Sequence, residues 1–272
     1  MAIYISNLIA GLEQGLDCPR LLLDMTEPFH GAVGIEFFIH TCSGTYMEKT
    51  EQIQRWMGTL PTALHGPFRF VEATSAPRTP EYETLLTAYG QAFRLARRLH
   101  CDHLVFHSNE CFVKAEEKQR LQAQCLANIE TLILRARPYG VRLLLENLAL
   151  PSKGTPLFDL KEYISLFHRF PEADCLIDIG HLAVARWDME TVIPALAPRI
   201  RGYHLHNNDG IRDSHSRIGD GIIDYNRFFR LYRTYTPHAD LTLEYGDDHG
   251  ISVEDVQEDV WYVMKSAEEA CH

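Results

Sequence analysis

The chain has 272 residues, of which 46% are hydrophobic and 23% are charged, and its formal net charge is -11. This composition is ordinary for a globular protein, and the sequence holds no run of about 18 apolar residues that would span a membrane. The acidic balance excludes a general attraction for nucleic acid, although a local basic groove is compatible with it.

The cysteines and the N-terminal segment bear on the cellular environment. The seven cysteines are spread along the chain without a C-x-x-C pair, so we expect free thiols rather than disulfides or a cysteine zinc site. The first residues lack the basic region of a signal peptide and turn acidic early. We therefore expect a cytoplasmic protein that does not enter a membrane.

Short apolar runs bounded by turn residues recur along the chain, with helix-periodic stretches between them. We expect eight strands, at Ile3–Ser6, Val33–Phe38, Thr62–Gly66, His103–His107, Arg142–Asn147, Asp174–Asp178, Arg201–His206 and Asp240–Tyr245. Helices are expected at Thr79–Leu99, Glu116–Ala136, Leu160–Phe170, Glu190–Ala197, Tyr225–Thr234 and Val253–Ala270. Strand followed by helix eight times predicts a (β/α)8 barrel, and because no linker divides the chain we expect one domain over residues 1–272.

Ionisable residues fall at the C-terminal ends of most predicted strands, and in barrels of this kind the active site forms at that face. The strongest set is Glu146, Asp178, His206 and Glu244. Each acid alone is as compatible with a helix N-cap or an arginine partner as with a metal ligand. Three carboxylates and an imidazole at one mouth, however, cannot all stay charged without a cation, and they are ligands that zinc and manganese accept.

Further imidazoles and carboxylates surround this set. His65 and His107 end two strands, where metal binding and a hydrogen bond to the backbone are equally reasonable roles. Alternation along a strand places His204 one layer below the ligands, where we expect it to fill the barrel core. Glu36 is expected to form a polar wall of the substrate site. The remaining candidates are His181, Asp213 and His215.

The motifs GIEFF, LHGPF, HLVFHS, LLLENL, LIDIGH, HLHNNDGIRDSH, IGDGIID and LTLEYG together resemble the xylose isomerase-like barrel superfamily. This superfamily contains sugar isomerases and epimerases together with DNA-repair enzymes of the endonuclease IV type. The resemblance extends from the second predicted strand to the eighth. It implies one divalent ion (manganese, zinc, magnesium or cobalt) bound by Glu146, Asp178, His206 and Glu244. It also implies that His181 and Arg212 contact oxygens of a sugar.

The endonuclease IV branch of the superfamily implies three zinc ions instead of one. Its ligand sets fall on His65, His107 and Glu146; on Glu146, Asp178, His206 and Glu244; and on His181, Asp213 and His215. Against this branch, LHGPFRF and VFHSNE replace its usual strand-three and strand-four motifs, and no counterpart of its DNA-inserting loops is evident. The acidic charge also argues against a nucleic-acid substrate.

The sequence therefore predicts a metal-dependent isomerase or epimerase of a sugar, sugar phosphate or related polyol or keto acid. Glu146 and Glu244 would move a proton on and off carbon through a metal-bound enediolate. An endonuclease IV-like phosphodiesterase is the first alternative, and a sugar-binding barrel without catalysis is the second. Family habit implies a homodimer or homotetramer.

Overall fold

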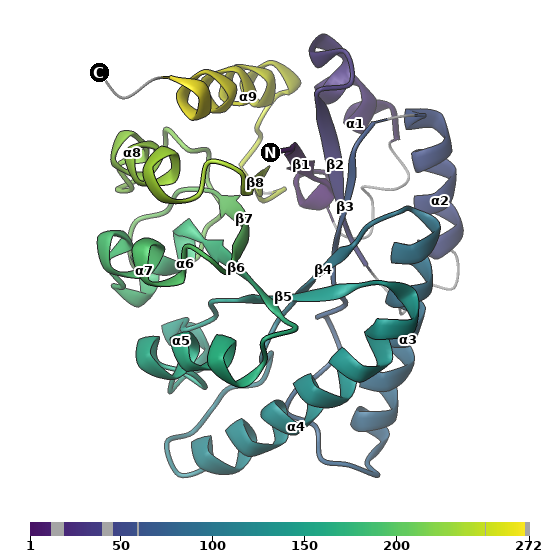
Figure 1. Cartoon of the computed structure of the whole chain (residues 1–272). Coiled ribbons are helices and arrows are strands. Elements are labelled where there is room, and N and C mark those ends of the chain that lie inside the picture. The colour runs from purple at the N-terminus through teal and green to yellow at the C-terminus, as the bar shows by residue number, and fades with distance from the viewer. Residues whose placement is uncertain (12–18, 40–45, 59, 248, 270–272) are drawn as a thin grey trace.

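The computed structural model describes residues 1–11, 19–39, 46–58, 60–247 and 249–269 (Figure 1). Eight parallel strands close into a barrel in which each strand pairs with the next in the sequence and β8 pairs with β1. Helices surround the barrel (Figure 1). The expected (β/α)8 architecture is confirmed.

The strands are β1 (Ile3–Ser6), β2 (Val33–Phe38), β3 (Thr62–His65), β4 (His103–Phe106), β5 (Arg142–Glu146), β6 (Asp174–Asp178), β7 (Ile200–Leu205) and β8 (Asp240–Leu243). The α-helices are α1 (Pro19–Thr26), α2 (Tyr46–Met57), α3 (Pro80–Arg98), α4 (Lys118–Ala136), α5 (Leu160–Arg169), α6 (Ile179–Ala185), α7 (Met189–Leu196), α8 (Tyr225–Tyr235) and α9 (Val253–Glu268). Short 3-10 helices are η1 (Asn7–Ala10), η2 (Glu27–Phe29), η3 (Arg137–Tyr139) and η4 (Pro151–Lys153).

All eight expected strands are present, but five of them end earlier than the sequence predicted. His107 and Glu244 were expected inside strands and lie just after β4 and β8. At these ends the chain leaves the regular ladder, and both side chains line the pocket at the barrel mouth. The apolar pattern therefore predicted the strands, and the polar residues that follow β4 and β8 line the pocket instead of continuing the strands.

The barrel interior changes character along its axis. Val105, Leu144 and Leu176 form a small apolar cluster inside the barrel. His204 also lies inside, fully buried, whereas its neighbour Tyr203 packs outside the barrel against the aromatic residues of α8. The strand alternation predicted for this segment is confirmed, and it places charged side chains above an apolar layer.

Four cysteines, Cys101, Cys111, Cys125 and Cys175, are free thiols, as expected. Cys18, Cys42 and Cys271 lie outside the described residues. Within the described ranges, none of the helices combines the length and apolar character needed to cross a membrane.

Candidate metal centre

Nine candidate ligands from six strand ends and the loop after β7 converge at the mouth of the barrel. They form overlapping groups whose donor atoms lie within 4.8 Å of one another. The nine are His65, His107, Glu146, Asp178, His181, His206, Asp213, His215 and Glu244, and the same groups also include Glu36 and His204. Convergence at the C-terminal ends of the strands follows from the parallel topology, which brings all these ends to one rim.

The first group consists of His65, His107 and Glu146. The Nδ1 atom of His65 lies 2.9 Å from the carbonyl oxygen of Gly66, and Nδ1 of His107 lies 2.8 Å from Glu110 Oε1. Because these oxygens accept hydrogen bonds, each Nδ1 carries a proton, and Nε2 is the ring nitrogen that faces the group and could bind a metal ion. The two Nε2 atoms are 3.1 Å apart and lie 3.6 and 2.9 Å from Glu146 Oε2. Two ring nitrogens and a carboxylate oxygen thus converge, and all three are atom types that bind zinc.

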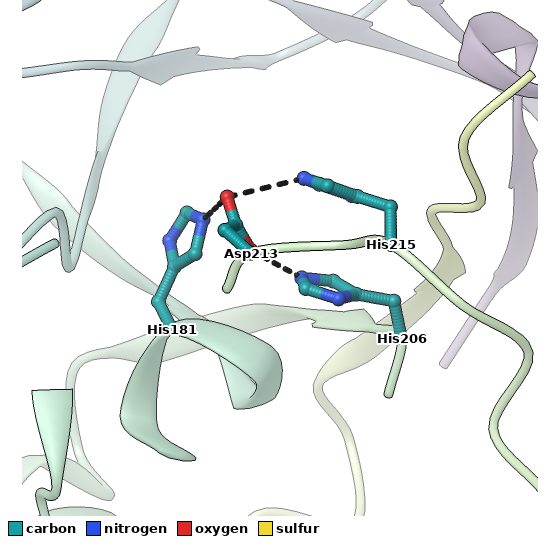
Figure 2. Close-up of side chains that lie close together, drawn as sticks. All are labelled: His181, His206, Asp213 and His215. Atoms are coloured by element: carbon teal, nitrogen blue, oxygen red, sulfur yellow. Dashed lines mark hydrogen bonds and ion pairs between the residues drawn. The ribbon is translucent and has the colours of Figure 1, made fainter. Parts of the chain in front are cut away.

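The second group has the same logic on the other side of the mouth. The Nδ1 atoms of His181 and His215 lie 3.0 Å from the carbonyl oxygens of Asn147 and Glu244, respectively. Their Nε2 atoms lie 3.1 and 3.3 Å from Asp213 Oδ2. Figure 2 shows Asp213 between the rings of His181 and His215. Backbone carbonyls therefore fix both rings with Nε2 toward the carboxylate.

The central group contains Asp178, His206 and Glu244, all of which are buried. Asp178 ends β6 and caps α6, because its side chain accepts a hydrogen bond of 2.7 Å from the backbone N–H of His181. Its carboxylate lies 3.0 Å from Nε2 of His206, whose Nδ1 is buried without a hydrogen bond among the described residues. Asn147 holds the backbone of Asp178 through both its N–H and its C=O. Asp178 is therefore a helix N-cap, the alternative role considered for each acid, and its carboxylate also lies beside His206; its role as a metal ligand stays a prediction.

The spacing of the donor atoms fits a divalent transition metal. Zinc binds imidazole nitrogen and carboxylate oxygen at about 2.0 to 2.2 Å, which in a tetrahedral site places the ligand atoms about 3.3 Å apart. In the two outer groups the donor atoms are 2.9 to 3.6 Å apart. Soft thiolate ligands are missing from every candidate group of the described residues, so the donor set suits zinc, manganese or cobalt.

The pKa shifts show that the buried acids and imidazoles at the mouth interact strongly. Burial would lower the pKa of His107, but the charge of Glu146 and the hydrogen bond to Glu110 outweigh it and raise the pKa to about 9. Burial would raise the pKa of Glu244, but the charge of His204 lowers it to about 2. Without a metal ion, protons on the histidines supply the positive charge that the carboxylates require.

His204 fills the barrel interior as expected, but it also contacts acids that the sequence did not place beside it. Its Nε2 lies 3.1 Å from Glu36 Oε1, and its Nδ1 lies 3.2 Å from Glu244 Oε2. Burial would lower the pKa of His204, yet the charges of Glu244 and Glu36 raise it well above its usual value. The ring therefore connects Glu36, one layer below, to the central group.

A pocket of about 440 Å³ opens at the mouth. Candidate ligands line its polar side, and Phe38 and Phe68 belong to its apolar wall. Neither Glu36 nor Arg212 is among its lining residues. Glu36 instead borders a separate cavity of about 240 Å³, and the Arg212 side chain is 84% exposed and lies 3.6 Å from Asp209. Of the three predicted substrate contacts, His181 alone borders the pocket.

Sequence reasoning missed two charged residues of the site. Glu110 orients His107, and Lys153 lies 2.8 Å from the second oxygen of Glu110. The position of Glu110 three residues after His107 was a usable signal, because a carboxylate often orients a metal-binding histidine. Lys153 gave no such signal, since it comes from a different loop, 43 residues away.

Comparison with known proteins places the chain in a family. The profile of the family described as xylose isomerase-like TIM barrel matches residues 28–265. None of the curated protein sequences matches the chain.

Solved structures show the same fold along the whole chain. A D-tagatose 3-epimerase-like protein superposes with a TM-score of 0.79 at 16% identity, covering 98% of this chain and 97% of its own. D-psicose 3-epimerase from Clostridium cellulolyticum H10, solved with D-tagatose, gives 0.78 at 9% identity, covering 99% and 100%. The TTHB071 protein from Thermus thermophilus, soaked with ZnCl2, gives 0.69 at 22% identity, covering 100% of each chain.

Proposed function

Because this chain belongs to the xylose isomerase-like TIM barrel family, we propose that it is a divalent-metal-dependent isomerase or epimerase of a sugar or related polyol or keto acid. The observation that carries the proposal is the position of Glu146 and Glu244. Both line the mouth pocket, and they come from two strand ends separated by β6 and β7. The sugar epimerases among the structural relatives support this substrate class.

In this proposal Glu146, Asp178, His206 and Glu244 hold the ion. A bound divalent ion supplies Lewis-acid polarisation of carbonyl and hydroxyl oxygens. Of the two glutamates, one removes a proton from carbon and the other returns it from a second direction. Their carboxylates are buried, which keeps water from competing for that proton. His181, whose ring is fixed by Asn147, positions a substrate oxygen.

Proton abstraction can be tested without knowing the physiological substrate. The metal-loaded protein is incubated with a panel of ketoses in deuterated water, and exchange at carbon is followed by NMR. We expect deuterium incorporation next to the carbonyl for at least one ketose, and none with the Glu244→Gln variant. Full metal content with no exchange for any ketose would contradict the proposal.

A metal-dependent phosphodiesterase is the second candidate. The specific observation in its favour is the pair of outer groups, because one ion in the central group leaves the converging lone pairs of His65 and His107 and of His181 and His215 unused. Three adjacent divalent ions suit phosphoryl transfer, in which they stabilise the attacking and leaving oxygens. The acidic charge of the chain weighs against DNA as the ester.

The metal content of protein purified without chelator separates the candidates. One equivalent of manganese, magnesium, cobalt or zinc supports the isomerase or epimerase. Close to three zinc ions supports the phosphodiesterase, which is then assayed with a chromogenic phosphodiester. Absence of metal, with retained binding of sugars, supports a barrel that binds sugars without catalysis.

A further inference from the structure

We propose that Lys153 binds an anionic group of the substrate, so that the substrate is a phosphorylated or carboxylated compound rather than a neutral sugar. This inference rests on the proposed function and narrows its substrate class. Lys153 is the single lysine or arginine among the described residues that line the mouth pocket. The remaining charged lining residues are acids or histidines, most of which are candidate metal ligands.

The position of Lys153 is fixed by main-chain hydrogen bonds. The N–H of Val113 donates to the Lys153 carbonyl at 2.8 Å, and the N–H of Lys153 donates to the Leu150 carbonyl at 2.9 Å. The N–H of Thr155 donates to the Val113 carbonyl at 2.9 Å, so the loops after β4 and β5 pair in a short parallel β-bridge between Val113 and Gly154. The lysine therefore starts from a rigid base, which lowers the entropy lost when it binds a ligand.

The ammonium group of Lys153 has N–H donors that remain available for a ligand. It lies 2.8 Å from Glu110 Oε2, and its side chain is 19% exposed. An ammonium carries three N–H donors, of which Glu110 accepts one. Glu110 directs the group to the side of the pocket next to His107. An anion at Lys153 would thus lie beside the first group of candidate ligands, which contains His107, and the reacting carbons of the substrate would lie over the central group.

The apolar part of the pocket supports a ligand with its charge at one end. Leu148, Leu150, Phe38 and Phe68 line the pocket together with Lys153. Their side chains offer no hydrogen bonds to the hydroxyl groups of a neutral sugar. Lysine is a common point-charge partner of phosphate and carboxylate, and a charge-assisted hydrogen bond changes affinity by about tenfold or more.

The test compares Lys153→Met with Lys153→Arg, and uses Lys118→Met as a matched control. Lys118 makes an equivalent ion pair with Glu162 at 2.7 Å and has similar exposure, but it does not line the pocket. Binding of inorganic phosphate and of acetate to the metal-loaded proteins is measured by calorimetry, and metal affinity is measured separately. We expect Lys153→Met to bind phosphate or acetate about tenfold more weakly, with unchanged metal affinity. Lys153→Arg and Lys118→Met should retain the original affinity. If Lys153→Met weakens phosphate binding more than acetate binding, the substrate is phosphorylated, and the reverse result indicates a carboxylated substrate.

Two outcomes overturn the inference. In the first, Lys153→Met loses metal and the loaded fraction binds both anions as before, so that the lysine merely supports Glu110 and His107. In the second, the KM of Lys153→Met in the deuterium-exchange assay rises equally for neutral and phosphorylated ketoses, so that the lysine does not distinguish anionic from neutral substrates. If the unaltered protein exchanges no ketose, the proposed function fails, while the anion-binding result still decides the role of Lys153.

Discussion

The two ends of the barrel both contain buried carboxylates, but they neutralise them differently. At the N-terminal end, Asp174 lies 2.5 Å from Arg142 Nε and 3.4 Å from His103 Nε2, with Arg199 at 3.9 Å. At the mouth, carboxylates face histidine nitrogens, and Lys153 is the one lysine or arginine among the described residues that line the pocket. A buried acid that the chain pairs by itself stabilises the fold, whereas a group of acids that the chain leaves short of positive charge indicates a site for an external cation.

The largest effect should come from removing a ligand at the mouth. In Glu146→Gln the amide keeps the shape of the side chain but not its charge, so the metal content should fall and kcat/KM should drop about 10³-fold. Metal analysis and the exchange assay measure the two effects. Glu172→Gln changes an exposed acid paired with Arg137 and serves as the control. A Glu146→Gln variant with full metal content and full activity would falsify the assignment.

Removing the metal with a chelator should destabilise the protein because the ligands at the barrel mouth lose their ion, while the Asp174 end of the barrel is unaffected. A ligand present at about 1,000 times its Kd stabilises the folded state by about 4 kcal/mol, so removing the metal should lower Tm by roughly 10 °C. Differential scanning calorimetry with and without chelator measures the shift. The same shift is expected in Asp174→Asn, because distant sites contribute independently. An unchanged Tm in the unaltered protein would show that the mouth binds no metal in its folded state.

The N-terminal end should show pH dependence without metal dependence. Burial would raise the pKa of Asp174, but the hydrogen bond to His103 and the interactions with Arg142 lower it to about 2. A carboxyl group whose pKa is lower in the folded than in the unfolded protein stabilises the fold at pH values above its unfolded pKa. This contribution is lost as the pH falls through its folded pKa. Asp174→Asn should therefore cost about 2 kcal/mol at pH 6, and roughly half of this difference should remain at pH 3. Urea unfolding across this pH range tests it, and a constant difference would contradict it.

The smallest effect should come from the residue that orients a ligand. Glu110→Gln keeps an acceptor for Nδ1 of His107 but weakens it, so zinc affinity should fall about tenfold. Competition with a fluorescent chelator measures the affinity. Glu162→Gln removes a lysine-paired acid outside the pocket and should leave the affinity unchanged. Equal zinc affinity in both variants would show that Glu110 has no part in metal binding.

The sequence predicted the strands more reliably than the helices. Buried strands are short apolar runs between turn residues, and this pattern identified all eight. The helices α1, α2 and α6 were not predicted. Of these, α1 and α6 have only eight and seven residues, which are too few to show a helical period. Helix α6 begins at Ile179, directly after Asp178, which the sequence had marked as a ligand and which also caps the helix.

The candidate ligands were predictable because parallel topology alone brings strand ends to one rim. The roles of Glu36, Arg212 and Lys153 were not, because they depend on side-chain direction and on contacts between loops. A strand end can be read from one stretch of sequence, so the sequence by itself determined the barrel and its ring of acids and imidazoles. The tertiary structure decided which imidazole and carboxylate atoms meet and where Lys153 lies, because those distances depend on packing between segments far apart in the chain.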